Sequence, residues 1–522
     1  MSSPACAMSS EGRLAPRCCA GHVTKLAVPF GPARQVTTAC FYALGRHTHR
    51  RGTTPFLLRK AYAQARDNAL SSVEGICTDR KRICTSYLVK QWIDKEHDMN
   101  YKEITNTIYN KRRFGKAPGR DVTKAMLELF DHPDLGMKII HIAGTNGKGS
   151  TAATLDQLLR EAGFRTGLFT SPHLIDFAER IRVSGEKISH EDVERLGEEI
   201  LTELELHPEI EDTMFDDALV MALLYFKEQA CDYVILETGL GGRLDSTSGL
   251  SQAPVLTMIT RIGLDHTAIL GNSLDQIARE KAGILHAGIP LVLAENEKEA
   301  ELAIREVATE LGSPIIDSPS LLRKVETYLT RYPSSLSGDY QKENLRSALL
   351  AFLYLIQETA FPGKEVENMI RKGLSRVSWP GRMQILSEDP FLLIDGAHNP
   401  QGIQALHDSL LHLYGKGPYI FLTGVLRDKD FSQMVALMAG LSDRVITVTV
   451  DNPRALPGVE LAKLYQEAGL LSAECMTLED ALSTALSEAK QSGRKVVAFG
   501  SLYFIGALLQ RWEAEDDHDH IH

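Results

Sequence analysis

Cysteine is scarce over most of this 522-residue sequence. Six of its eight cysteines fall within the first 84 residues, and only Cys231 and Cys475 stand in the rest. A main body with so few cysteines has no disulfide framework, which is typical of proteins that work in a reducing compartment. Long apolar runs are missing too, because none approaches the roughly 18 residues of a membrane helix. We therefore expect no membrane partner.

The sequence also lacks an excess of positive charge. Its net charge is −11 at pH 7, with 24% charged and 43% hydrophobic residues, which is an ordinary balance for a globular chain. A negative chain has no general attraction for a phosphate backbone, so we expect no nucleic-acid partner. The length leaves room for several domains.

Residues 1–98 differ in composition from the rest of the chain. Residues 1–60 carry nine Lys and Arg against one acid, Glu11, and "GRHTHRRGTTPFLLRK" is rich in Arg, as organelle transit peptides are. One interpretation is a cleaved targeting segment, which would make the protein mitochondrial. The other is an unstructured or misassigned leader before a cytoplasmic protein that begins at Met99. We favour the second because 98 residues is long for a targeting peptide.

An orderly alternation of apolar runs and amphipathic segments occupies the rest of the chain. Runs that are apolar throughout are typical of parallel strands buried on both faces. Such runs fall at 138–144, 165–171, 232–240, 253–263 and 289–295. They predict an α/β domain with a mainly parallel sheet over residues 99–376.

The alternation restarts after "VSWPGR" at 377–382. The runs "FLLIDG", "YIFLTGVL", "DRVITVTV" and "KVVAFGS" are separated by helical patterns, and they predict a smaller Rossmann-like α/β domain over 377–512. The tail at 513–522, "EAEDDHDHIH", is more typical of a solvated charge run than of a metal site.

The segment "HIAGTNGKGST" at 141–151 stands between a predicted strand and a predicted helix. A standard phosphate-binding loop, G-x-x-x-x-G-K-[S/T], would need glycine where this chain has Ile142, and Gly149 is an extra glycine after Lys148. Glycines still let backbone N–H groups turn toward a phosphate at a helix N-terminus. The alternative is an ordinary Gly-rich turn. We predict that ATP contacts Gly144, Thr145, Asn146, Gly147, Lys148, Gly149, Ser150 and Thr151.

Further motifs come after this loop in a fixed order. They are "FTSPHL" (169–174), "ERIRVSG" (179–185), "ETGLGGRLDSTS" (237–248), "IGLDHTAILG" (262–271), "REKAGI" (279–284), "WPGRMQ" (379–384), "DGAHNPQG" (395–402) and "FGSLYFIG" (499–506). Together they resemble the Mur ligase superfamily, and within it the folylpolyglutamate synthase and dihydrofolate synthase family, over roughly residues 99–512. A chain of this length from Met99 is most similar to the bacterial bifunctional members.

The resemblance implies an ATP-dependent acid–amino-acid ligase. ATP would convert a carboxylate to an acyl phosphate, and the amine of L-glutamate would then displace phosphate. The implied acceptors are dihydropteroate, reduced folates or both, and the implied state is a monomer. Three alternatives stay open: a phosphotransferase with the same type of loop, another Mur-type amino-acid ligase, and a non-catalytic nucleotide-binding module.

The resemblance also implies one or two Mg²⁺ ions. It assigns metal contacts to Ser171, His266 and Lys281, the last as a carbamylated lysine that holds a second ion. A fourth ligand falls in "TMFDD", where the family usually has T-x-F-E and this chain has Asp216. Asp217 beside it is the alternative ligand.

The remaining implied contacts complete the site. Asn344, Arg382 and Asp395 would bind ATP, while Tyr340 stands where the family often has His. Arg180, His398 and Ser501 would bind the other substrates. The residues implied to act in catalysis are Lys148, Lys281 and His398.

Overall fold

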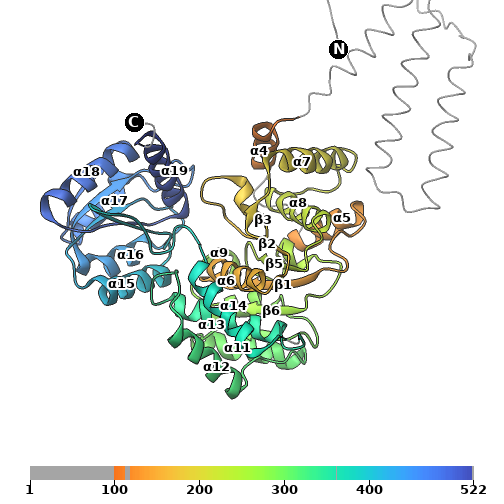
Figure 1. Cartoon of the computed structure of the whole chain (residues 1–522). Helices are drawn as coiled ribbons and strands as arrows, with labels where there is room; N and C mark the ends of the chain where they lie inside the picture. The colour runs from red at the N-terminus through yellow and green to blue at the C-terminus, as the bar shows by residue number, and fades with distance from the viewer. Residues whose placement is uncertain (1–98, 112–117, 360, 520–522) are drawn as a thin grey trace, which may run out of the picture. The chain divides into compact units, whose positions relative to one another are not determined.

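The computed structural model describes residues 99–111, 118–359 and 361–519 (Figure 1). The expectations for residues 1–98 and for the last residues of the tail lie outside this part of the chain. Within the described residues, no helix combines the length and the apolar character needed to cross a bilayer.

A seven-stranded sheet is formed by the first half of the described chain. Its strand order is β4-β3-β2-β5-β1-β6-β7. The parallel strands are β1 (Lys138–Ala143), β2 (Thr166–Phe169), β5 (Tyr233–Glu237), β6 (Leu256–Ile259) and β7 (Leu291–Leu293), and the antiparallel edge is β3 (Ile181–Val183) with β4 (Glu186–Lys187). β1 is central, with Ile140 in register with Ile235 of β5 and Leu256 of β6.

Helices cover both faces of this sheet (Figure 1). Because side chains alternate across a strand, Ile139 of β1 packs with one set of helices while Ile140 and Ile142 pack with the other. The first set is α4 (Tyr101–Tyr109), α5 (Gly119–Leu129), α7 (His190–Glu205) and α8 (Met214–Glu228), and the second is α6 (Lys148–Glu161), α12 (Pro319–Arg331), α13 (Gln341–Leu355) and α14 (Gly363–Arg376). A third cluster joins β7 to α9 (Thr267–Leu270), α10 (Leu274–Ala282) and α11 (Lys298–Glu310).

A six-stranded sheet is formed by the second half, in the order β12-β11-β10-β13-β9-β8. Its strands are β8 (Gln384–Glu388), β9 (Phe391–Asp395), β10 (Tyr419–Thr423), β11 (Ser442–Val448), β12 (Leu471–Cys475) and β13 (Val496–Phe499); only β8 is antiparallel to its neighbour. One face packs on α15 (Pro400–Tyr414), α16 (Phe431–Met438) and α17 (Gly458–Glu467), and the other on α18 (Leu478–Ser492) and α19 (Leu502–Asp519).

The predicted α/β class with mainly parallel sheets is confirmed, and each predicted strand is present in shorter form. The strands that sequence did not predict are β3, β4, β8 and β12. They are short or carry polar residues, and three of them are antiparallel. In a parallel sheet, ligands bind beyond the carboxyl ends of the strands. In this chain β1, β5, β6 and β9 end at the motif residues.

Candidate active site

The phosphate-type loop connects β1 to α6. Gly147 is the N-cap of α6 and has φ +90°, while Gly144 has φ +153°. Both values lie where side chains are disfavoured, and a Cβ on Gly147 would lie 2.1 Å from Oδ1 of Asn344. The loop therefore needs these glycines both for its backbone path and for the close approach of Asn344.

The extra glycine of the loop has a different reason. Gly149 has an ordinary helical backbone, but a Cβ there would lie 2.8 Å from the indole of Trp379. Trp379 belongs to the segment between α14 and β8 that leads into the second sheet. Gly149 thus lets this connecting segment pack directly on the first turn of α6.

Lys148 lies on the inner side of the loop. Its Nζ donates to the carbonyl oxygens of Gly144 at 3.1 Å and Thr145 at 3.3 Å. The same Nζ is 3.9 Å from Oε1 of Glu237. A cation held this way, at the N-terminus of a 14-residue helix, creates a strong anion-binding position.

Glu237 is a site residue that the sequence analysis missed. It is the last residue of β5, is only 4% exposed, and its Oε2 accepts a hydrogen bond from the backbone N–H of Ser171 at 3.1 Å. Burial raises the pKa of its carboxyl, and Lys148 opposes that rise. The available signal was an acid at the end of a buried strand, immediately before the glycines of "ETGLGG". Carboxylate oxygen is the ligand type that Mg²⁺ prefers.

Asp216, the predicted metal ligand, lines the cavity and also belongs to a capping box. It is fully buried in a capping box at the start of α8, where its Oδ2 accepts from Thr213 N at 2.9 Å and from Thr213 Oγ1 at 2.6 Å. Its Oδ1 accepts from Ser246 Oγ at 2.6 Å and from Thr123 Oγ1 at 3.2 Å. A carboxylate has about four acceptor positions, and four donors already use them. The carboxylate of Asp216 thus serves as the N3 member of the capping box whose N-cap is Thr213, and its role as a metal ligand stays a prediction.

The alternative ligand, Asp217, is also engaged elsewhere. Its Oδ2 lies 2.5 Å from Nζ of Lys111, which also contacts Asp212. Burial and the neighbouring Asp212 carboxyl raise the pKa of Asp217 well above its usual value. This triad joins the start of α8 to the end of α4 and does not line the cavity that contains the loop.

Lys281 approaches the loop from α10. Its Nζ donates to the carbonyl oxygen of Gly144 at 2.8 Å, and the residue is buried. Burial, reinforced by the nearby charge of Lys148, lowers the pKa of Lys281 to about 7. Near neutral pH, Lys281 is therefore a neutral amine in a large fraction of the molecules, and the neutral amine is the form that can react with CO₂.

His266 comes after β6, on the other side of the loop. Its backbone is left-handed, with φ 51° and ψ 37°, and its ring is one-third exposed and 3.9 Å from Oδ1 of Asp265. Burial lowers the pKa of His266, so that its ring is neutral and can act as a ligand.

The second domain contributes Asp395 at the end of β9. Its Oδ2 accepts from Tyr340 Oη at 2.7 Å and from Met383 N at 2.9 Å, and its Oδ1 accepts from Ala397 N at 2.8 Å. Burial raises the pKa of this carboxyl, and Arg382 opposes the rise. Tyr340, whose contact was open from sequence, thus binds the predicted nucleotide-binding acid directly.

His398 lies on the loop after β9. Its Nδ1 donates to the carbonyl oxygen of Gly396 at 2.7 Å, which leaves Nε2 as the unprotonated nitrogen, 3.9 Å from Oδ2 of Asp265. Burial and the charge of Lys429 lower the pKa of His398 to about 4. The ring is therefore neutral at physiological pH.

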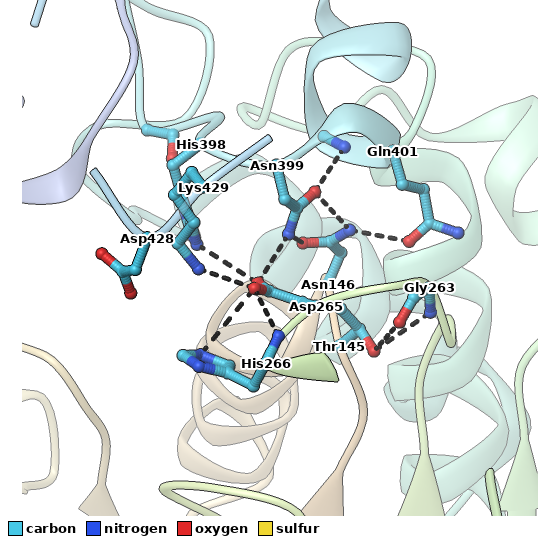
Figure 2. A network of polar contacts seen from close by, with 12 residues as sticks. Thr145, Asn146, Gly263, Asp265, His266, His398, Asn399, Gln401, Asp428 and Lys429 are labelled. Atoms are coloured by element: carbon cyan, nitrogen blue, oxygen red, sulfur yellow. Dashed lines mark hydrogen bonds and ion pairs between the residues drawn. The ribbon is translucent and has the colours of Figure 1, made fainter. Parts of the chain in front are cut away.

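Figure 2 shows a polar network that connects the two domains around Asp265. Lys429 donates to Oδ1 of Asp265 at 2.7 Å and Asn399 donates to Oδ2 at 3.0 Å. Although burial raises the pKa of Asp265, the nearby Lys429, His266 and His398 together hold it below its usual range. Lys429 is the second site residue that sequence reasoning missed, because "LRDKDF" has the composition of an ordinary exposed turn.

The other predicted substrate residues line the same cavity. Arg180 is buried and its Nε donates to Nδ1 of His173 at 2.8 Å. Ser501 is buried, and its Oγ accepts from the backbone N–H of Phe504 at 3.0 Å, at the start of α19. Asn344 donates to Oε1 of Gln341 at 2.8 Å.

One cavity of about 1670 Å³ is lined by the predicted site residues except Thr151, which does not line it. A typical small-molecule site is about 300–1,000 Å³, so this cavity has room for a nucleotide and further substrates. Among the described residues, no three His, Cys, Asp or Glu side chains form a ready-made metal cluster. Mg²⁺ at a nucleotide is usually held by one or two carboxylates with phosphates and water. Glu237 supplies a carboxylate that fits this pattern, and Ser171 and His266 line the same cavity.

Comparisons with known proteins agree with this geometry. Residues 142–316 match the Mur ligase middle domain and residues 381–502 match the Mur ligase glutamate ligase domain. The fold and site thus define a Mur-type ligase. The chain is 34% identical over 432 residues to the dihydrofolate synthase/folylpolyglutamate synthase of Bacillus subtilis, which covers 79% of this chain and 99% of that protein. The Escherichia coli protein of the same name is 32% identical over 385 residues, covering 71% and 86%. The chain belongs to the dihydrofolate synthase/folylpolyglutamate synthase family.

Solved structures are similar as well. Mycobacterium tuberculosis folylpolyglutamate synthase complexed with ADP superposes with a TM-score of 0.70 at 25% identity, covering 79% of this chain and 97% of that one. E. coli FolC in complex with DHPP and ADP gives 0.68 at 27% identity, covering 80% and 99%. The predicted family, fold class and enzyme class, an ATP-dependent acid–amino-acid ligase, are confirmed.

Proposed function

We propose that this chain uses ATP to join L-glutamate to dihydropteroate, to reduced folates, or to both. The observation that carries the proposal is that Lys148 and Glu237 of the first domain share one cavity with His398 and Ser501 of the second. The relatives support it by name, and the ADP, folate and DHPP complexes among similar structures support the substrate classes.

In the first step, an acceptor carboxylate oxygen attacks the γ-phosphorus of ATP, and ADP leaves. The backbone amides at the N-terminus of α6 and Lys148 hold the phosphates, whereas the amides of Thr145 and Asn146 donate to the carbonyl oxygen of Arg261. Arg382 adds a second cation from the other domain. When bound, Mg²⁺ would neutralise phosphate charge, and Glu237, Ser171 and His266 would hold it. These residues lower the barrier by positioning and by charge neutralisation.

In the second step, the glutamate amine attacks the acyl carbon, the C–O bond to phosphate breaks, and the amine proton is released. The neutral Nε2 of His398 is placed to accept a hydrogen bond from that amine, because Nδ1 is committed to Gly396. Closure of the cleft between the two domains would limit access of water, which would otherwise hydrolyse the acyl phosphate.

We propose that Lys281 adds CO₂ to become a carbamate. The neutral nitrogen bonds to the carbon of CO₂ and loses one proton, which exchanges a cation for an anion beside the loop. The pKa of about 7 and the burial of Nζ support this reaction. We also propose a cytoplasmic monomer, and the few cysteines of the main body support a reducing compartment.

The test is an acceptor panel with purified protein, comparing dihydropteroate with reduced monoglutamyl folates. We expect ADP formation only when glutamate and a pteroyl acid are both present, with an amide product of one added glutamate. A stable phosphorylated acceptor would instead identify a phosphotransferase, and nucleotide binding without turnover would identify a binding module.

A further inference from the structure

The amide of Asn146 points away from the loop it belongs to. Its Nδ2 donates to Oε1 of Gln401 at 2.7 Å and to Oδ1 of Asn399 at 3.3 Å, while its Oδ1 accepts from Nδ2 of Asn399 at 3.1 Å. The backbone N–H of Asn146 donates to the carbonyl oxygen of Arg261. A residue in the middle of the phosphate-type loop thus directs its side chain into the second domain (Figure 2).

Asn399 is the main partner of the Asn146 side chain, and both the oxygen and the NH₂ group of its amide form two hydrogen bonds each. Its Oδ1 also accepts from the backbone N–H of Gly402 at 2.8 Å, as the N-cap of α15, and its Nδ2 also donates to Oδ2 of Asp265 at 3.0 Å. Asn399 is only 2% exposed. The donor on one side and the carboxylate on the other fix which way the amide faces.

The contacts form a continuous path. They run from the phosphate-type loop through Asn146 to Asn399, then to Asp265, and from there to Lys429 at 2.7 Å. Lys429 and Asn399 come from the second domain, whereas Asn146 and Asp265 come from the first. His398 is the residue next to Asn399, and its Nε2 lies 3.9 Å from Oδ2 of Asp265, the carboxylate oxygen that Asn399 binds.

We infer that Asn399 is a positioning residue that couples the nucleotide loop to the amino-acid side of the site. A helix cap needs only an acceptor oxygen, which Ser and Asp supply as well as Asn. Asn399 does more than cap the helix, because its NH₂ group donates hydrogen bonds to both Asn146 and Asp265. The inference rests on the proposed ligase for its kinetic readout, while ADP binding tests it independently.

Two substitutions separate coupling from capping. Asn399→Ser keeps an N-cap oxygen and removes both amide links. Asn399→Asp keeps the cap and the acceptor for Asn146, but it places a carboxylate beside the carboxylate of Asp265. If Asn399 served only as a helix cap, the Asp variant should be as active as the Ser variant or more active. If Asn399 couples the two domains, the Asp variant should be less active than the Ser variant, because its carboxylate would repel the carboxylate of Asp265 at hydrogen-bond distance.

We expect Asn399→Ser to lower kcat/KM for ATP about tenfold and Asn399→Asp to lower it at least about fivefold further. ADP affinity measured by calorimetry should show the same order. The matched control is Thr477→Ala, which removes the N-cap of α18 in the same domain but outside the cavity. It should lower the melting temperature and leave kcat/KM within about twofold.

A double-mutant cycle completes the test. If Asn146 and Asn399 act through their shared contact, Asn146→Ala with Asn399→Ser should be no more than about twofold worse than the more affected single variant. Effects that multiply, or an Asp variant as active as the Ser variant, would overturn the inference. The predicted ranking in ADP affinity alone, in a protein that does not ligate glutamate, would sustain the coupling and refute only the proposed function.

Discussion

The Nζ of Lys148 lies 3.9 Å from Oε1 of Glu237, beyond hydrogen-bond distance. The two charged groups therefore attract each other without forming a direct hydrogen bond. Each retains capacity for a further partner: an anion on the lysine and a cation on the carboxylate.

Replacement of Lys148 by Ala should abolish most ligation while the fold persists. Loss of one phosphate-holding cation costs about 10²–10³ in kcat. The measurement is steady-state turnover at saturating ATP, with a thermal melt as the fold check. Lys364→Ala, at an exposed lysine in α14, is the control. Near-normal turnover of the Lys148 variant would remove this side chain from the mechanism.

Glu237→Gln should raise the Mg²⁺ concentration needed for half-maximal activity at least about tenfold, because a neutral amide binds the cation less strongly. Asp216→Asn should not change the Mg²⁺ concentration needed for half-maximal activity. It should lower the free energy of unfolding by about 1–3 kcal/mol, because the new NH₂ group would face hydrogen-bond donors in place of the oxygen that accepted from them. The measurement pairs a magnesium titration with urea unfolding. A shifted Mg²⁺ curve for Asp216→Asn and an unshifted one for Glu237→Gln would restore the assignment made from sequence.

Gly149→Ala should weaken ATP binding through its clash with Trp379. The added Cβ lies 2.8 Å from the indole, so either the first turn of α6 or the connecting segment must shift. We expect KM for ATP to rise several-fold, and the rise to shrink when Trp379 is replaced by Leu. Gly363→Ala, where a Cβ meets nothing within 4 Å, is the control. An equal effect of Gly149→Ala in both backgrounds would exclude the indole as its cause.

Lys281 predicts a pH-dependent stability. Its folded pKa of about 7 lies below the usual value of 10.5, so the folded state binds fewer protons than the unfolded state between these values. The buried ammonium group lowers the free energy of unfolding by its full amount below pH 7, and this destabilisation disappears as the pH rises toward 10.5. In CO₂-free buffer, Lys281→Met should therefore exceed the parent in stability most at pH 6, and by less at pH 9. A difference that does not change with pH would contradict the lowered pKa.

Local apolar patterns predicted the elements, and the resemblance to a family predicted most of the residues that line the cavity. Apolar runs located β1, β5 and β9, and the order of motifs located the cavity residues. The metal-ligand assignment of Asp216 relies on likeness to a family motif and stays a prediction, because a capping box that begins at Thr213 has the same local sequence. Only the fold shows that Ser246 and Thr123 complete the set of donors around that carboxylate.

Other features could not be predicted because they join distant segments. Nothing local relates Gly149 to Trp379, or Asn146 to Asn399, and Lys429 becomes significant only when Asp265 stands beside it. The short strands β3 and β4 have too few residues for a two-residue period to be recognised. They form because the edge of β2 offers unpaired backbone groups.

The hydroxyl of Tyr340 is a neutral hydrogen-bond donor to Asp395 that does not change its protonation state. Burial and the neighbouring Asp395 raise the pKa of this phenol well above its usual value of 10.0, so it stays protonated throughout the range in which cells live. An imidazole, which often occupies this position in the family, gains and loses a proton within that range. Acidification would therefore leave the donor side of this hydrogen bond unchanged, and any acid sensitivity of the contact must come from Asp395, whose pKa is raised by burial.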